Sequence, residues 1–368
     1  MRAARQRSGW HVRVGLSAVL ALLLTGCALP GSSPVTGMVR RAGHTSTLLG
    51  DGRILVTGGD DGGALNSAEL FDPATGRWAA TTPLGSARED HTATLLPEGQ
   101  VLVVGGWRGG GGLDTAERYD PASGRWTSAG RMGVRRMQHM ATLLPNGRVL
   151  VTGGKPGINA GDYDTAEAEL YDPSGDRWTR AAPMAHARHG HTATLLPDGR
   201  VLVIGGSGGG LDTDTRTAEA YQPAEGRWAP VAPPLHGHIN TPAALLADGT
   251  VLVVDSVAGS ERYDPVADRW LPVATPALPL SWIALAPLPD GRVLAASEAT
   301  VEAFDPATDR WQCLGPLATP RIQPTATALP DGRVVLIGGT TTGPPAEIIT
   351  PIADGRAYRA IPSVAVAP

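Results

Sequence analysis

Closely spaced histidines are the first feature of the sequence that could do chemistry. Five of the nine histidines fall between positions 186 and 238, and they include two His-x-His pairs. In an extended strand this spacing places both imidazoles on one face, and imidazole is a ligand for zinc, copper and nickel. The candidate metal ligands are His189, His191, His236 and His238. No cysteine and few acids lie nearby, so the alternative is a solvated loop with one structural histidine, and we expect no bound cofactor.

Arginines at a repeated position form a second candidate site. Each stands three residues before a histidine or before the residue that replaces it. They are Arg41, Arg88, Arg136, Arg188 and Arg321. A mouth lined by one sign of charge focuses the electric field, so these residues predict a funnel for an anionic ligand. The alternative is that the arginines pair with acids of nearby loops or with backbone carbonyls.

Three aromatic residues fall outside the repeated aromatic positions and are therefore free to contact a ligand. They are Trp107, Tyr163 and Trp282. Trp107 and Tyr163 lie in long, glycine-rich segments that vary in length and sequence. Variable loops on a rigid scaffold are where binding residues usually lie. We therefore add these aromatics and the five arginines to the candidate ligand-binding residues.

A unit repeated seven times frames all of these residues. In its fourth copy the unit contains HTATLLPDGRVLVIGG followed by AEAYQPAEGRW. The units cover about 38–84, 85–132, 133–184, 185–234, 235–276, 277–317 and 318–362. A period of this length with strand-like content indicates propeller blades or a solenoid.

Each unit predicts four short strands. Asp-Gly or Asn-Gly makes the first hairpin turn, Gly-Gly ends the second strand, and Asp-Pro opens the turn before the fourth strand. The glycine doublets are Gly58, Gly59, Gly105, Gly106, Gly153, Gly154, Gly205, Gly206, Gly338 and Gly339. The tryptophans of the fourth strands are Trp78, Trp126, Trp178, Trp228, Trp270 and Trp311. Because these residues and one glutamate per unit recur around the whole chain, we assign them structural roles.

The glycine doublet, the Tyr/Phe-Asp-Pro sequence and the later tryptophan together resemble the kelch repeat. This resemblance implies an all-β, kelch-type β-propeller of the galactose-oxidase-like superfamily. We expect seven four-stranded blades, or six if one degenerate unit forms none. Units five and six depart from the pattern, with Asp255-Ser256 and Ala296-Ser297 near the place of the doublet. That divergence is either functional or the result of drift.

The N-terminus has the pattern of a targeting signal. Four arginines precede an apolar run from Val14 to Leu24, which is too short to span a bilayer but typical of a signal peptide. The following Leu24-Thr25-Gly26-Cys27 resembles a bacterial lipobox. This implies a signal peptide over 1–26, lipidation of Cys27, a tether over 27–37 and the propeller over 38–368. The lipoprotein would then be anchored in the cell envelope on the extracytoplasmic side, periplasmic or cell-surface. The alternative is an ordinary secretory signal with a chance cysteine.

Composition narrows the class of protein. The net charge of −4 gives no reason to expect nucleic-acid binding, and two cysteines exclude a disulfide scaffold. Glycine and proline together account for 80 of 368 residues, so turns must be frequent. We expect a monomeric propeller.

Three functions remain open at this point. The first is a non-catalytic binding module for a protein or carbohydrate, acting through the face that carries the loops between strands two and three and between blades. The second is a sugar enzyme similar to kelch-type mutarotases, which would use Arg88 or Arg188 with an acid at the channel mouth. The third is a copper oxidase resembling galactose oxidase, for which the sequence shows no complete ligand set. We name no catalytic residue and lean toward the binding module.

Overall fold

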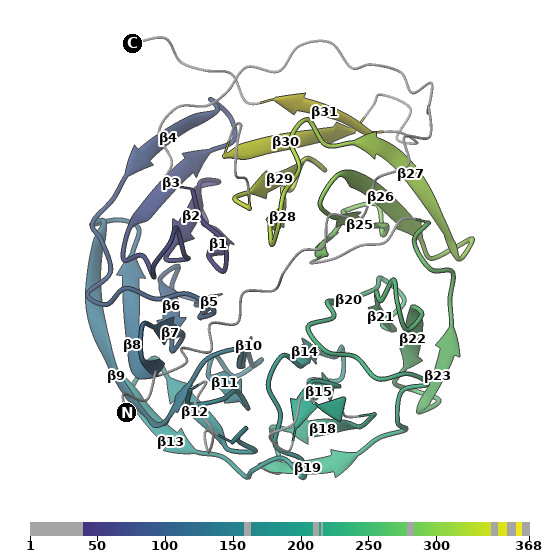
Figure 1. Cartoon of the computed structure of the whole chain (residues 1–368). Coiled ribbons are helices and arrows are strands. Elements are labelled where there is room, and N and C mark those ends of the chain that lie inside the picture. The colour runs from purple at the N-terminus through teal and green to yellow at the C-terminus, as the bar shows by residue number, and fades with distance from the viewer. Residues whose placement is uncertain are drawn as a thin grey trace, which may run out of the picture. The chain divides into compact units, whose positions relative to one another are not determined.

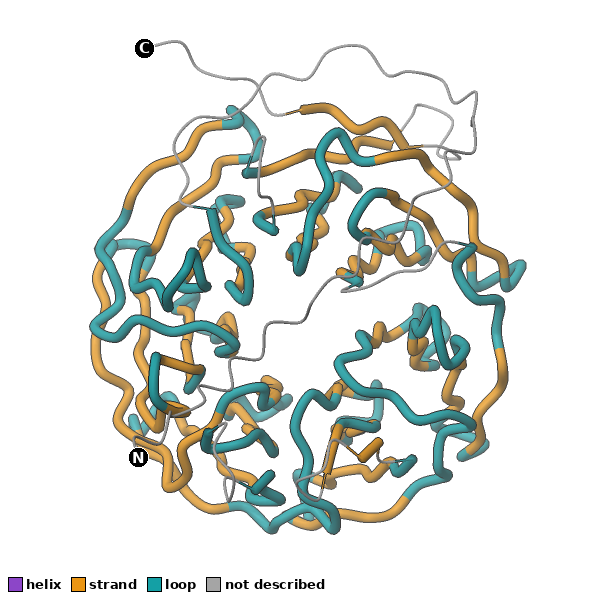
Figure 2. Tube along the Cα trace, viewed as in Figure 1, coloured by secondary structure: helices purple, strands orange, loops and turns teal. Residues whose placement is uncertain are grey.

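The computed structural model describes residues 40–157, 163–208, 213–214, 216–277, 283–339, 345–351 and 358–362. These residues form seven four-stranded antiparallel sheets, which Figure 1 shows as blades around a ring. Figure 2 shows strands and loops and no helix in the described part of the chain. The predicted seven-bladed, all-β propeller is therefore confirmed. Within the described residues, no helix has the length and hydrophobicity needed to cross a membrane.

The blades follow one another along the chain. Blade 1 comprises β1 (Thr45–Leu48), β2 (Ile54–Thr57), β3 (Ala68–Asp72) and β4 (Arg77–Ala80). Blade 2 comprises β5 (Thr92–Leu95), β6 (Val101–Val104), β8 (Gly111–Asp120) and β9 (Arg125–Arg136), with β7 (Trp107–Arg108) paired to β8. Blade 3 comprises β10 (Met140–Leu143), β11 (Val149–Thr152), β12 (Ala168–Asp172) and β13 (Arg177–Arg180). Each sheet takes its four main strands from one stretch of sequence.

The remaining blades repeat this order. Blade 4 comprises β14 (Thr192–Leu195), β15 (Val201–Ile204), β18 (Ala218–Gln222) and β19 (Arg227–Pro230), and its loop holds β16 (Ser207–Gly208) paired with β17 (Thr213–Asp214). Blade 5 comprises β20 (Ala243–Leu245), β21 (Val251–Val253), β22 (Glu261–Asp264) and β23 (Arg269–Pro272). Blade 6 comprises β24 (Ala284–Pro287), β25 (Val293–Ala296), β26 (Thr300–Asp305) and β27 (Arg310–Pro316). Blade 7 comprises β28 (Thr325–Ala328), β29 (Val334–Ile337), β30 (Ala346–Pro351) and β31 (Tyr358–Pro362).

Aromatic pairs hold the outer strands and join successive blades. Tyr119 on β8 is fully buried and packs against Trp126 on β9 with ring centroids 5.0 Å apart. The indole N–H of Trp126 donates to the carbonyl of Thr82 in blade 1, at 2.8 Å. The same inter-blade bond is made by Trp178, Trp228, Trp270 and Trp311. These aromatics therefore act in packing, as such large buried rings usually do.

The ring closes by packing between blades 1 and 7, which share no sheet. Phe71, Val335 and Ile337 belong to one buried cluster that spans both blades. The Nε2 atom of His44 lies 3.1 Å from the hydroxyl of Thr325. Side chains rather than an exchanged strand therefore join the first blade to the last.

Every described residue belongs to one unit of the chain, Ser32–Pro368. The expected signal peptide over 1–26, the tether over 27–37 and Cys27 lie outside the described residues. Trp282 also lies outside them.

Candidate functional site

The five repeated arginines are buried clamps. Arg136 donates from Nη1 to the carbonyls of Gly153 at 2.8 Å and Glu167 at 3.1 Å, and from Nη2 to Glu169 at 2.7 Å. Its side chain is fully buried. Burial lowers the pKa of Arg136 below its usual value, whereas Glu169 acts in the opposite direction. The guanidinium group thus joins the end of β11 to the glutamate of β12.

The other arginines make the same pairs, and all five side chains are fully buried. The pairs are Arg41 with Glu69, Arg88 with Glu117, Arg188 with Glu219 and Arg321 with Glu347. Residues held in this way cannot line a ligand funnel, so that hypothesis is wrong for all five. Pairing with backbone carbonyls occurs, but the acidic partners are the repeated glutamates and not loop acids. The structure therefore removes Arg88 and Arg188 from a mutarotase-like site.

The glycine doublets leave room for the chain segments that carry these arginines. A Cβ atom on Gly153 would lie 2.5 Å from the carbonyl oxygen of Arg188 and 2.7 Å from Cε1 of His191. Gly153 and Gly154 also have φ angles of 61° and 97°, a region that side chains disfavour. The next blade can therefore pack against β11 only when the doublet has no side chains.

The candidate metal ligands do not converge. Nε2 of His191 lies 2.9 Å from the Thr152 hydroxyl, and Nδ1 of His189 lies 2.7 Å from Asp164. His236 is exposed, and His238 contacts acids of its own blade. In the described part of the chain, no group of three or more histidine, cysteine or acidic residues could hold a metal ion. The predicted metal site is therefore wrong, because each imidazole has a separate environment.

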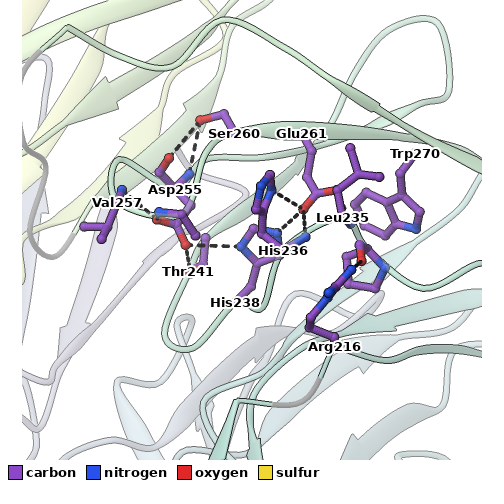
Figure 3. A network of polar contacts seen from close by, with 12 residues as sticks. Arg216, Leu235, His236, His238, Thr241, Asp255, Val257, Ser260, Glu261 and Trp270 are labelled. Atoms are coloured by element: carbon purple, nitrogen blue, oxygen red, sulfur yellow. Dashed lines mark hydrogen bonds and ion pairs between the residues drawn. The ribbon is translucent and has the colours of Figure 1, made fainter.

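Blade 5 contains a distinct polar network, drawn in Figure 3. Nε2 of His238 lies 2.6 Å from Glu261, and Nδ1 lies 3.2 Å from Asp255, on the other side of the ring. Burial alone would lower the pKa of His238, but hydrogen bonds from the imidazole to Asp255 and Glu261 outweigh burial and raise it to about 9. His238 stands three residues before Thr241, the position that arginine holds in the clamps. Blade 5 therefore replaces arginine by a charged histidine.

A partial ring of backbone hydrogen bonds links the segments before the innermost strands of blades 1 to 5. Asp90 donates its N–H to the carbonyl of Gly43 at 2.9 Å, and Gln138 donates to Asp90 at 3.2 Å. Gly190 donates to Gln138 at 3.0 Å, and Asn240 donates to Gly190 at 2.8 Å. Each of these residues stands two or three positions before the first strand of its blade. Because the bonds pass from blade to blade, they fix five blades at one height around the ring axis.

We call this ring the collar and include Gln323, which has the same position in blade 7. The non-glycine members of the collar adopt left-handed backbone conformations. The φ angles are 51° for Asp90, 52° for Gln138, 53° for Asn240 and 56° for Gln323. Such conformations cost roughly 1 kcal/mol or more each and tend to persist at functional sites. The collar is therefore a candidate binding surface.

The collar side chains line a cavity of about 420 Å³. It is bounded by Thr45, Asp90, His91, Thr92, Ala93, Gln138, His139, Met140, Ala141, Gly190, His191, Asn240 and Gln323. This volume falls within the range of small-molecule sites. The amides and the carboxyl offer both donors and acceptors, which suits hydroxyl groups better than a metal or a lipid.

Charged side chains accompany the collar on blades 1 to 3. Burial, then the neighbouring charges of Asp60 and Asp90, raise the pKa of Glu89 to about 7. Glu89 exchanges two backbone hydrogen bonds with Trp107, at 2.6 Å and 3.1 Å. The Lys155 ammonium counteracts the burial that raises the pKa of Asp90. The backbone of Trp107 is thus bonded to the residue that precedes Asp90 of the collar. A ligand contact by its side chain stays a prediction.

The other predicted aromatics contribute less. Tyr163 is 68% exposed and has no bonded partner among the described residues, and Trp282 is not described. Trp282 nevertheless has the collar position of blade 6 in the sequence. Cys313, the thiol that a copper oxidase would require, lies exposed on the outer strand β27.

Sequence reasoning missed the collar residues Asp90, Gln138, Asn240 and Gln323. A signal for them existed, because each stands directly before the histidine position or its substitute. The arginine two residues earlier and the histidine that follows recur in four units, whereas the residue between varies among glycine, aspartate and glutamine. A variable residue between two recurring residues indicates that the recurring pair holds its backbone in place while its side chain is free to serve binding.

Comparisons with known proteins place this geometry in a family. The model of the KLHDC2/KLHL20/DRC7 Kelch-repeats domain matches residues 31–244. A solved structure titled "Structure of YjhT" is similar with a TM-score of 0.56 and 15% sequence identity, over 89% of this chain and 98% of that chain, which shows the fold alone. No curated protein matches the chain. Because the family match covers more than half of the sequence and agrees with the blades described above, the chain belongs to the Kelch-repeat family.

Proposed function

We propose that the protein is a lipid-anchored, extracytoplasmic binding module that holds a polyhydroxylated ligand, a carbohydrate group, at the collar. The Kelch propeller is commonly a protein-interaction fold, and function must be argued from the site. The observation that carries the proposal is the cavity of about 420 Å³ bounded by the polar collar. The buried clamps and the inter-blade tryptophans make its frame rigid.

The chemistry of the collar favours a neutral ligand with several hydroxyl groups. Gln138, Asn240 and Gln323 carry amides, each of which can donate and accept at the same time. Asp90 adds an acceptor that is bonded to Gln138 at 3.2 Å. Desolvation of these amide and carboxyl groups costs little free energy when ligand hydroxyl groups replace water one for one.

Variants to glycine give the sharpest test of the collar. Glycine tolerates φ values near 52°, so Gln138→Gly and Asn240→Gly remove side chains without straining the backbone. We expect a carbohydrate panel to yield a ligand that raises the melting temperature, and the double variant to lose that shift while remaining folded. A glycan ligand bound equally well by the double variant would contradict the site. A panel without any hit, combined with capture of a protein partner that depends on Gln138 and Asn240, would replace the carbohydrate by a protein ligand.

The anchor is supported by the sequence Leu24-Thr25-Gly26-Cys27 after the apolar run. Expression in a bacterium should give a membrane-bound form with the mass of a lipidated Cys27. Cys27→Ala should abolish the lipid mass and release the protein from the membrane fraction. A chain that is cleaved elsewhere and carries no lipid in its native form would identify an ordinary secretory signal instead.

A sugar-converting enzyme is the second candidate, and Glu89 is the observation that favours it. A carboxyl group with a pKa of about 7 can both give and take a proton at neutral pH. Exchange NMR on the anomers of a bound reducing sugar would test this activity. We expect Glu89→Gln to abolish any catalysed exchange while leaving binding intact, whereas equal exchange in both proteins would exclude Glu89 from the reaction.

A further inference from the structure

Two neighbouring turns on the face opposite the collar depart from the pattern of the other blades. The turn between β10 and β11 has Asn146 before its glycine, where four turns have an aspartate that pairs with the following arginine. Those pairs are Asp51 with Arg53, Asp198 with Arg200, Asp290 with Arg292 and Asp331 with Arg333, at 2.6 to 2.8 Å. The turn between β18 and β19 opens with Gln222, where five other blades have aspartate. Two carboxylates are therefore missing from adjacent blades.

The first replacement leaves Arg148 without its usual acceptors. Asn146 accepts only the backbone N–H of Arg148, at 3.1 Å. Arg200 and Arg333 also donate to proline carbonyls in the next blade, at 3.3 Å and 2.9 Å. Arg148 is exposed, and no hydrogen bond or ion pair to a described residue holds its guanidinium group. Its positive charge acts to lower the pKa values of Tyr221 and Asp172.

The second replacement leaves the blade 4 turn without its cap. In blade 1, Asp72 accepts the backbone N–H of Ala74 at 2.9 Å, and the equivalent aspartates do the same in blades 2, 3, 5 and 6. In blade 4 the equivalent N–H belongs to Ala224, and no described group accepts it. The Gln222 amide is also unbonded, with a buried Oε1 that has no partner. Rotation of the amide would present its NH₂ group at the same place.

The tyrosine of this blade lacks the partner that others have. Tyr171 donates its hydroxyl to Asp176 at 2.6 Å, and Tyr263 donates to Asp268 at 2.7 Å. Blade 4 has Gly226 at that position, and the hydroxyl of Tyr221 has no partner among the described residues. Burial raises the pKa of Tyr221, and the charge of Arg148 acts in the opposite direction. Tyr221 therefore stays a protonated donor.

A cavity of about 510 Å³ lies where these turns meet. It is bounded by Pro145, Asn146, Asp198, Gly199, Arg200, Gln222, Pro223, Ala224 and Glu225. Its two carboxylates are already paired, Asp198 with Arg200 and Glu225 with Arg227. Ala224, with its N–H, is one of the lining residues, and Arg148 and Tyr221 stand within two positions of lining residues in the sequence. The described residues supply no acceptor for any of these three donors.

We infer that this cavity binds an organic carboxylate, whose oxygens take the place of the two missing aspartates. Other blades show that a carboxylate suits these donors, because aspartates bond the arginine in four turns, the backbone N–H in five blades and the tyrosine hydroxyl in blades 3 and 5. Hydrogen bonds between a guanidinium group and a carboxylate are short and about twice as strong as neutral ones. The ligand is either a free dicarboxylic acid or an acidic side chain of a peptide, since both present the same group.

Calorimetric titration with succinate, with a glutamate-containing blocked peptide and with the neutral analogue succinamide tests this inference. We expect succinate or the peptide to bind and succinamide to be at least about tenfold weaker, the factor expected for one charge-assisted bond. The stronger of the two acidic probes identifies the source of the carboxylate. Sulfate is the control anion. If it binds as tightly as succinate, the attraction is that of any anion and the inference is overturned. The absence of binding by both acidic probes would also overturn it.

Matched variants keep the test independent of folding. Arg148→Gln should weaken the acidic probe by about tenfold, whereas Arg53→Gln, in the equivalent turn of blade 1, should leave its affinity unchanged. Asn146→Asp and Gln222→Asp restore the carboxylates that the other blades have. We expect each new carboxylate to occupy the donors and so to lower the affinity for the acidic probe. A protein with both aspartates that binds succinate as tightly as the native protein would refute the site, because in the double variant Arg148 and the N–H of Ala224 would already have internal acceptors.

Discussion

Blade 5 and the other clamped blades pair the same buried glutamate with different cations. In blades 1 to 4 and in blade 7, an arginine reaches from the segment before the first strand to a glycine carbonyl and to a buried glutamate of the same blade. In blade 5 the shorter His238 cannot span that distance, and Asp255 stands in the place of the first glycine and meets the imidazole at 3.2 Å. The second contact, to Glu261, is kept at 2.6 Å. Six of the seven units hold a cation at this position, whereas the sequence has Leu280 there in the sixth unit. Where the cation changes from arginine to histidine, its neighbours change with it.

The two cations differ in one property that can be measured. Arginine remains charged at every pH at which proteins are stable, whereas the pKa of His238 is about 9. The arginine clamps should therefore be insensitive to pH, and blade 5 should not.

Removal of one arginine should have the largest effect on stability. Arg136→Met would leave Glu169 buried without its cation, which typically costs about 3–5 kcal/mol. Urea denaturation would measure the loss, and the double variant Arg136→Met with Glu169→Met should recover much of it. A single variant as stable as the native protein would show that the clamp contributes nothing.

Removal of the histidine should cost less and depend on pH. His238→Ala leaves Asp255 and Glu261 without their shared cation, so we expect a loss of about 2–3 kcal/mol at pH 6. At pH 10 the native imidazole is already neutral, so the variant and the native protein should differ far less. An equal loss at both pH values would mean that the imidazole acts through packing and not through charge.

The smallest effect should come from the collar. Gln138→Gly releases a left-handed residue whose φ is 52°, so it should change stability by no more than about 1 kcal/mol, in the favourable direction. Thermal denaturation measures this change, and the carbohydrate titration measures the loss of binding. Clear destabilisation would show that the side chain serves the frame rather than the ligand.

The repeated motifs were sufficient to predict the propeller, because tight turns, glycine doublets and aromatic pairs are local signals that seven copies reinforce. They also identified the glutamates as structural. They did not reveal that Arg136 bonds Glu169, because the two residues are 33 positions apart and meet only when the sheet folds. Asn240 escaped notice since its role depends on a ring of bonds between blades, and His238 was misread because an isolated His-x-His pair also suits a metal.

The replacement of the clamp arginine by His238 is tested most directly by the pH dependence of the free energy of unfolding. It should be measured for the native protein and for a variant that gives blade 5 the arginine and glycine of the other clamps. A group whose pKa is raised on folding, here from about 6.5 to about 9, stabilises fully below pH 6.5 and loses that contribution as the pH rises to 9. We therefore expect the native protein to lose about 2–3 kcal/mol between pH 6 and pH 9.5. His238→Arg combined with Asp255→Gly should remove most of this loss. An identical decline in both proteins would contradict the account, because the lost stability would then not come from His238.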